Sequence, residues 1–269
     1  MQYKSRIKII TCGFLLAIMA GCNLPDASTT TPSTPPIETT VIPTAEQLNP
    51  ELNPGGTCDN TLFTVKQGAT WTYVNTGSPA GTFNYTDTIT NVRSDGFTVT
   101  SQFSDLIRTQ EWACKPEGLQ AVQLGETIAM ALSTQGISAD LTTSDVTGVT
   151  LPVNITLGMQ WSYGFGLQGT ITYEGQKADA NGTVTTTLEE AGSETITVPA
   201  GTFDATRIQA TSSFDLTASY FGFEVPVDYA TTSTLWYAPG VGLVKLVESS
   251  NLEGTSFSST TELQTYNIP

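Results

Sequence analysis

The sequence contains no histidine, so its cysteines and carboxylates are the side chains that could take part in chemistry. A Ser-His-Asp triad, a Cys-His pair and a histidine zinc site each require an imidazole, so these mechanisms are excluded. Two carboxylates could hydrolyse a glycosidic bond by general acid and base or nucleophilic catalysis. The acids available for such a pair are Asp204, Asp215, Glu224 and Asp228. Their spacing does not single out any two of them.

The remaining acidic residues form no recognisable site. No D-x-[DN]-x-[DN]-G calcium loop occurs, and the adjacent Glu189 and Glu190 are typical of a solvated strand end. We therefore expect no enzyme activity, no metal and no cofactor. A carboxylate-dependent glycosidase is the catalytic alternative.

The amino terminus has the pattern of an export signal. Lys4, Arg6 and Lys8 precede an apolar run from Ile9 to Ala20. A run of about 12 residues has the length of a signal-peptide core and is too short to cross a bilayer, which takes about 20. Residues 1–21 are therefore predicted to be a signal peptide.

The residues at the end of this run, Met19-Ala20-Gly21-Cys22, resemble the bacterial lipobox, with Met19 where leucine is usual. The resemblance implies cleavage before Cys22 and a diacylglyceryl thioether on its sulfur, often with a third acyl chain on its amine. Two or more chains anchor a protein stably to a membrane. Asn23 is not the aspartate associated with inner-membrane retention, so the resemblance implies the outer membrane or cell surface.

Two cysteines remain after Cys12 leaves with the leader and Cys22 is lipidated. Cys58 and Cys114 are an even pair in an oxidising compartment, which predicts one disulfide. A reactive or metal-binding thiol is the alternative, but the chain has no histidine and no C-x-x-C motif to support it.

Composition favours an all-β protein that does not bind nucleic acid. Without residues 1–21, which contain three of the ten basic and none of the 25 acidic residues, the net charge is 7 − 25 = −18. Such a surface repels nucleic acid and anionic lipid headgroups. Charged residues make up only 13% of the chain and threonine is abundant, which favours strands over helices.

Residues 22–57 are rich in threonine, proline and serine and poor in apolar residues. They predict a disordered tether in which the prolines favour extended conformations. Beyond it, apolar residues alternate with polar ones, as at Phe83, Tyr85 and Ile89, which predicts half-buried antiparallel strands. Asn181-Gly182 is a tight-hairpin signal. Only the segment Glu126 to Leu132 has a composition that favours a helix.

An internal repeat divides the rest of the chain. Gly68-Ala69-Thr70-Trp71-Thr72-Tyr73 recurs as Gly158-Met159-Gln160-Trp161-Ser162-Tyr163, and each copy is followed by a second pairing, Trp112 with Gly118-Leu119 and Trp236 with Gly242-Leu243. We interpret residues 58–150 and 151–269 as a tandem duplicated β-module. The two tryptophans are 236 − 161 = 75 positions apart in the second copy and 112 − 71 = 41 in the first, so the second is expected to contain an additional hairpin.

The repeated aromatic residues have two interpretations. A tryptophan and a tyrosine two positions apart lie on one face of a strand and could fill the core. They could instead form a stacking platform for a sugar or lipid. The candidate ligand-face aromatics are Trp71, Tyr73, Trp161, Tyr163, Trp236 and Tyr237.

The segment from Leu235 to Lys245, together with Val198 to Phe203, resembles the C-terminal signature of uncharacterised exported proteins of the domain-of-unknown-function 3108-like group. The resemblance extends from Leu151 to the end. It implies a curved antiparallel sheet, similar to a lipoprotein-carrier half barrel, and no catalytic residues. The first copy departs from the pattern, with Cys114 near the position where the second has Ala238.

Together these features predict an all-β fold of curved antiparallel sheets or a half-barrel-like sandwich. The expected protein is an extracytoplasmic lipoprotein, anchored to the cell envelope through Cys22, with a non-enzymatic binding or envelope-structural role. Its ligand would be apolar, a glycan or a surface protein, and a lipid or lipoprotein carrier is the alternative. A cleft lined by Leu, Ile, Val and Phe would favour the carrier, whereas exposed tryptophan beside acids would favour sugar.

Overall fold

The computed structural model describes residues 58–78, 81–104, 106–124, 137–220, 223–252 and 255–269. The predicted signal peptide, Cys22, the tether at 22–57 and the helical prediction at Glu126–Leu132 lie outside these residues. The chain divides into units Met1–Leu48 and Asn49–Pro269, and every described residue belongs to the second unit.

The described residues form strands joined by turns and contain no helix, so no membrane-spanning helix is found among them. The strands are β1 (Thr70–Thr76), β2 (Phe83–Val92), β3 (Gly96–Gln102), β4 (Ile107–Lys115), β5 (Gly118–Ala121), β6 (Ile137–Gly148), β7 (Leu151–Pro152), β8 (Gln160–Tyr173), β9 (Gln176–Val198), β10 (Gly201–Tyr220), β11 (Phe223–Ala238), β12 (Gly242–Leu252) and β13 (Thr255–Asn267).

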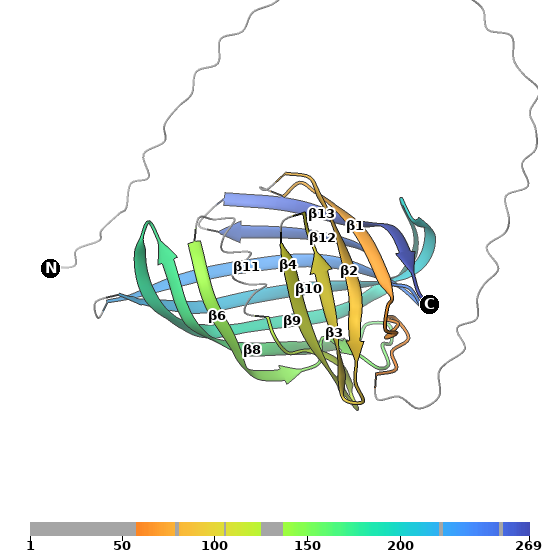
Figure 1. The fold of residues 1–269 in the computed structure, drawn as a ribbon, viewed down its shortest axis with the longest axis horizontal. Helices are drawn as coiled ribbons and strands as arrows, with labels where there is room; N and C mark the ends of the chain where they lie inside the picture. Colours follow the sequence, from red (N-terminus) through yellow and green to blue (C-terminus); the bar gives the residue numbers. More distant parts are fainter. Residues whose placement is uncertain (1–57, 79–80, 105, 125–136, 221–222, 253–254) are drawn as a thin grey trace, which may run out of the picture. The chain divides into compact units, whose positions relative to one another are not determined.

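These strands make one 13-stranded sheet in the order β6-β8-β9-β10-β11-β12-β13-β1-β2-β3-β4-β5-β7. The paired strands are antiparallel throughout, from the β8–β9 and β9–β10 ladders to the β1–β13 ladder that joins the two parts of the chain. The sheet is curved and not closed (Figure 1). The predicted all-β, half-barrel-like fold is therefore confirmed.

The strands of the second part of the chain are much longer than those of the first. β9 has 23 residues and β10 has 20, whereas β1 and β3 have seven each. At about 3.3 Å per residue, β10 is about 66 Å long and β1 about 23 Å. We call β8–β11 the tall wall and β1–β4 the short wall.

The two ends of the sheet differ. The turns β1–β2, β3–β4, β8–β9 and β10–β11 lie at one end, which we call the rim end, because neighbouring strands alternate in direction. At the opposite core end, the Phe63 ring stacks on Trp71, Phe97 and Trp112 at centroid distances of 5.4, 5.9 and 6.3 Å. Trp71 and Phe97 are fully buried, so this stack is the centre of the aromatic core.

The two predicted repeats have the same strand order. β1 to β5 follow one another in the sheet as β8 to β12 do, and both segments belong to the one sheet. The prediction of an additional hairpin in the second copy is wrong. Four strands, β8 to β11, run from Trp161 to Trp236, and four, β1 to β4, run from Trp71 to Trp112. The additional residues lengthen the strands of the tall wall instead.

The edges of the sheet meet through side-chain hydrogen bonds rather than through a ladder. The Gln120 amide donates to the Gly148 carbonyl at 2.6 Å, and the Leu124 N–H donates to the Thr143 hydroxyl at 2.8 Å. The region after β5 thus lies beside β6, the strand at the other edge. This contact brings the curved sheet close to a barrel without closing it.

Candidate functional site

The inner face of the tall wall is apolar. Register places the following residues on this face in neighbouring strands: Leu167 and Ile171 of β8, Ala180 and Val184 of β9, and Leu216 and Ala218 of β10. All six are buried. Between them along the strands lie polar, outward-facing residues such as Asp179, Thr183 and Asp215, which are exposed. This alternation makes the tall wall an amphipathic sheet with its apolar side inward.

This apolar face continues to the rim end, where it becomes exposed. Val225 of β11 pairs with Ala218 and therefore shares its face, and Phe223 lies two residues before it. Val225 is 52% exposed and Phe223 75%. On β8, Tyr173 follows Ile171 on the same face and is 51% exposed. Large apolar side chains therefore face the concave side without being covered by the described residues.

Glycine at two inner positions of the tall wall permits close strand contact. A Cβ on Gly169 of β8 would lie 1.9 Å from the Asp140 carbonyl oxygen, and one on Gly182 of β9 would lie 2.0 Å from that of Asp215. No side chain fits at either position. Glycine inside a strand often marks such a bend or close backbone approach. These glycines therefore allow the curvature that makes the inner face concave.

The inner face of the short wall is polar and aromatic. Asp87 of β2 pairs in register with Ser101 of β3, which pairs with Arg108 of β4. The Ser101 hydroxyl is hydrogen-bonded to the Asp87 carboxyl and also accepts a bond from Arg108 Nη2 at 3.3 Å. The Arg108 guanidinium lies 5.9 Å from the centre of the Phe103 ring, and Phe103 stacks on Tyr85 at 5.1 Å. A charged pair is thus held against an aromatic surface.

Burial changes the protonation of the inner carboxyls. Desolvation raises the pKa of Asp87 above its ordinary value, and the Ser101 hydrogen bond and the Arg108 charge lower it in part. Desolvation also raises the pKa of Glu248 on β12, against the hydrogen bond from Ser233. Both carboxyls therefore ionise less readily than exposed ones.

On the inner face of the short wall, two oxygen atoms have no hydrogen-bond partner among the described residues. They are Asp87 Oδ1 and Asn75 Oδ1, and the amide of Asn75 donates to the Thr261 hydroxyl at 2.9 Å. Buried acceptors of this kind are usually satisfied by ordered water. We therefore expect the inner face of the short wall to be hydrated, in contrast with the apolar tall wall.

The repeated Trp-x-Tyr motifs lie at the core end of their strands. Trp71 and Tyr73 are buried, and they donate to the carbonyls of Val241 at 2.6 Å and Leu243 at 2.9 Å. In the second copy, the Tyr163 hydroxyl donates to the Ala121 carbonyl at 2.6 Å. Each tyrosine thus donates to the strand that begins with the Gly-Leu pair of the other copy, Tyr73 to β12 and Tyr163 to β5.

The remaining aromatic candidates are distributed over different places. Trp161 is half-buried and donates to the Thr150 carbonyl at 3.4 Å. The Trp236 indole donates to Glu194 at 2.8 Å, with the Lys245 ammonium 6.0 Å from its ring centre. Burial raises the pKa of its neighbour Tyr237 to about 12. The structure does not bring the six candidates together on one surface.

Three of the four acids considered for glycosidase chemistry lie on exposed strand positions. Asp204, Asp215 and Glu224 are all exposed, and Asp204 accepts a hydrogen bond from the Thr195 hydroxyl at 2.6 Å. Register pairs Asp215 with Asp228. Among the described residues, no three acids or cysteines are grouped in a way that could hold a metal ion.

The expectation of a solvated strand end at Glu189 and Glu190 is wrong for Glu190, which is buried. Its two carboxylate oxygens accept the backbone N–H groups of Gly158 at 2.9 Å and Gly192 at 3.0 Å. Carboxylates that accept backbone N–H groups stabilise turns. Glu190 therefore fixes the start of β8, whereas Glu189 is exposed.

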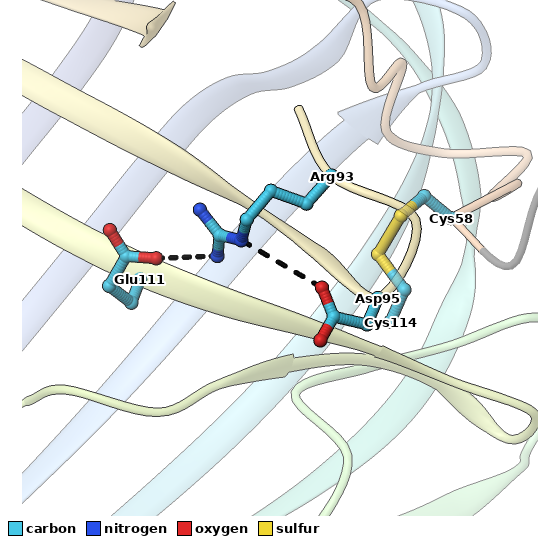
Figure 2. Close-up of a disulfide and its surroundings, with 5 residues drawn as sticks. All are labelled: Cys58, Arg93, Asp95, Glu111 and Cys114. Carbon is cyan, nitrogen blue, oxygen red and sulfur yellow. Dashed lines mark hydrogen bonds and ion pairs between the residues drawn. A yellow bond between two sulfur atoms is a disulfide. The ribbon is translucent and has the colours of Figure 1, made fainter. Parts of the chain in front are cut away.

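The predicted disulfide between Cys58 and Cys114 is confirmed (Figure 2). It joins the segment before β1 to the end of β4. In the same view, Arg93 lies between Asp95 and Glu111, with nitrogen–oxygen distances of 3.8 and 2.6 Å. Arg93 also donates to Thr98 at 3.0 Å. These bonds link β2, β3 and β4 beside the disulfide.

A family model described as DUF3108-like matches residues 113–263, which is more than half of the chain. The chain belongs to the DUF3108-like family. The sequence resemblance is thereby confirmed, and the DUF3108-like region contains the whole of the tall wall. The short-wall residues Asp87, Ser101 and Arg108 precede this region.

The DUF3108-like chain also has similar solved structures. A Bacteroides fragilis NCTC 9343 protein, described as a candidate exported protein with a YmcC-like fold, is 12% identical; the match covers 78% of this chain and 100% of that one, with a TM-score of 0.47. A candidate lipoprotein from Parabacteroides distasonis ATCC 8503 is 15% identical, with coverages of 78% and 99% and a TM-score of 0.45.

The hypothetical lipoprotein YmcC from Escherichia coli K12 is 12% identical, with coverages of 75% and 85% and a TM-score of 0.34. At these scores the likeness is general, and the names of these proteins imply no function for the DUF3108-like chain. The comparison with curated proteins finds no match.

The sequence interpretation missed Asp87, Ser101 and Arg108 as inner residues of the DUF3108-like protein. One signal was present, because Asp87 occupies the period-two position between Tyr85 and Ile89 in an otherwise apolar series. A charged residue in such a series indicates a polar group on the inner face. Its partners could not be identified, because the register between β2, β3 and β4 is not visible in the sequence.

Proposed function

We propose that this protein is a lipid-anchored extracytoplasmic binding module whose tall wall binds an apolar ligand, such as an acyl chain, on its inner face. The observation that supports the ligand class is the continuous apolar face of the tall wall, which is buried at Leu167 and Leu216 and becomes exposed at Val225 and Phe223 at the rim. A surface of this composition favours aliphatic ligands, because it offers few polar groups.

The proposed location follows from the leader and from cysteine use. The basic residues, the short apolar run and the lipobox-like end at Cys22 favour export and lipidation. The Cys58–Cys114 disulfide is compatible with an oxidising compartment outside the cytoplasm. Lipidation would hold the module at the outer membrane or cell surface.

A glycan is a weaker candidate for the ligand. Sugar sites combine accessible aromatic rings with polar groups, but Trp71 and Tyr73 are buried, and Trp236, the tryptophan beside the acid Glu194, is half-buried. The apolar alternative is the ligand class of a lipid or lipoprotein carrier. A permanent anchor on Cys22 fits a protein that receives or retains such a ligand better than one that diffuses with it.

Native mass spectrometry of the protein purified gently from its host tests this function. The expected result is an additional mass, non-covalently bound, that releases a fatty acid or phospholipid on denaturation. Intact-mass analysis of the same denatured sample reports lipidation of Cys22 separately. A bound oligosaccharide, or a protein that remains empty when fatty acid is added in excess, would contradict the proposal.

A further inference from the structure

The large apolar side chains that are exposed in the described residues gather at the rim end. Eight are exposed, and five of them lie at that end: Leu106, Ile107, Tyr173, Phe223 and Val225. Their exposed fractions range from 46% to 75%. Exposed apolar groups gathered at one place indicate an interaction surface, whereas single ones are ordinary.

These five residues come from different strands and share one end of the sheet. Leu106 and Ile107 follow the β3–β4 turn on the short wall, and Tyr173 ends β8. Phe223 and Val225 begin β11 on the tall wall. The tips of the tall wall lie beyond those of the short wall, so a planar apolar surface that approaches the rim end meets Tyr173, Phe223 and Val225.

We propose that the rim end docks on the lipid bilayer to which Cys22 is anchored. This inference rests on the proposed function, and it adds the source of the apolar ligand. The inner face of the tall wall reaches the rim at Phe223 and Val225, so a docked rim would let an acyl chain pass from the bilayer to that face without crossing water.

The length of the tether permits this orientation. Cys58 is bonded to Cys114 near the core end, so the tether enters the sheet at the end away from the rim. The 36 residues from 22 to 57 can span at most about 120 Å. The longest tall-wall strands span about 66 to 76 Å. The anchor can therefore lie in the same bilayer that the rim contacts.

Charges at the rim determine which lipids it accepts. Glu174 and Glu224 adjoin the apolar residues at the tips of the tall wall and are exposed, and Lys177 is a nearby exposed cation. A rim with this acidic excess is repelled by anionic headgroups and tolerates zwitterionic ones. Docking is therefore expected to be stronger on phosphatidylcholine or phosphatidylethanolamine vesicles than on phosphatidylglycerol vesicles.

Depth-dependent quenching tests the inference with the full lipidated chain in phosphatidylcholine vesicles. Glu224→Cys places a polarity-sensitive dye at the rim without removing any of the five apolar residues. Leu157→Cys is the matched control, because Leu157 is 81% exposed and lies at the core end. Cys58 and Cys114 are in a disulfide and do not take the dye.

The expected result is a blue shift and a loss of emission with lipid-bound quenchers at position 224, and neither change at position 157. Adding Tyr173→Asp, a substitution at a 51% exposed position on the tall wall, is expected to reduce the quenching at 224. Equal quenching at both positions would overturn the inference. So would a blue shift at 224 without lipid quenching, because a second protein would then cover the rim.

This result can be separated from the proposed function. Binding of fatty acid by the soluble Cys22→Ser chain tests the ligand class without a bilayer, and quenching tests docking. A chain that binds fatty acid but shows no quenching at 224 would contradict only the docking. An intact mass without lipid on Cys22 would overturn the docking inference, because no bilayer would then be held near the rim.

Discussion

At the scale of the residue, the inner carboxyl of Asp87 is the least expected feature. It lies on a strand whose other inner residues, Tyr85 and Ile89, are aromatic or apolar. Partial neutralisation by Arg108 and the hydrogen bond from Ser101 reduce the cost of its burial but do not remove it, because its pKa is still raised. The ionised form is therefore destabilised in the folded protein relative to the unfolded chain.

This predicts a pH dependence of stability. A carboxyl with a raised pKa holds its proton longer in the folded state, so the folded protein binds more protons between the ordinary pKa of 3.8 and the raised value. The free energy of unfolding contributed by Asp87 is therefore largest below about pH 4 and falls as pH rises through this window. The variant Asp87→Asn is expected to gain stability relative to wild type as pH rises, measured by urea unfolding.

The variant Ser101→Ala provides the comparison. It removes the hydrogen bond that lowers the pKa of Asp87, so the fall in stability should extend to higher pH than in the wild type. In the double variant Asp87→Asn/Ser101→Ala, loss of the Ser101 hydroxyl should no longer shift the pH profile of stability, because the carboxyl on which it acts is absent. If wild type and Asp87→Asn have parallel pH profiles above pH 4, the proposed state of Asp87 is wrong.

At the scale of the element, the disulfide holds the segment before β1 onto the aromatic core. Cys58 and Cys114 are 56 positions apart, and Phe63, five residues after Cys58, stacks between Trp71, Phe97 and Trp112. Without the bond, this segment would be held at the core by packing and by hydrogen bonds such as those of Asn60 to the Pro152 carbonyl at 2.9 Å and of Thr64 to the Gly240 carbonyl at 2.7 Å.

Removal of the disulfide should therefore destabilise the fold. The double variant Cys58→Ser/Cys114→Ser is expected to lose about 2–4 kcal/mol of unfolding free energy, since a closed loop of this length restricts the unfolded chain. Chemical unfolding of the oxidised protein, the reduced protein and the variant measures this loss. An unfolding midpoint that is the same with and without reductant would show that the bond contributes nothing.

Alternation and turn signals predicted the strands and the curved antiparallel sheet, because period two and hairpin residues are local properties of the chain. They did not predict that the strands of residues 151–269 are the longer ones, since the same threonine-rich residues can form a turn or the interior of a strand. Gly182 is an example: Asn181-Gly182 reads as a hairpin, but both residues lie within β9. Ladders with β8 and β10 on both sides outweigh the local turn preference there.

The side-chain sites were less predictable than the strands, since they depend on register. Asp87, Ser101 and Arg108 come from three strands and meet only through the β2–β3 and β3–β4 ladders. Glu190 was expected in solvent because glutamate usually is, yet the backbone N–H groups of Gly158 and Gly192 bind it. The disulfide was predictable because an oxidising compartment and an even pair leave one pairing.

At the scale of the whole molecule, the described sheet combines a sealed core end with an apolar inner face that is exposed at the rim. The aromatic stack around Phe63 occupies the core end, and the tall wall extends beyond the short wall toward the rim. A sheet of this form can enclose a ligand on one side without needing a second domain. The central claim is that this ligand is apolar and lies against the tall wall.

The most direct test compares inner and outer charges on the same strands. Tyr173→Asp/Val225→Asp adds two carboxylates to the inner face at exposed positions, and Thr172→Asp/Pro226→Asp adds the same charge to adjacent outward positions. Fatty-acid affinity is measured by fluorescence titration of the soluble Cys22→Ser chain. The account predicts an affinity weaker by about tenfold or more for the inner variant and no change for the outer one. The reason is that desolvating a carboxylate costs more than about 1.4 kcal/mol, which corresponds to a factor of about ten. Equal affinities for the two variants would contradict it.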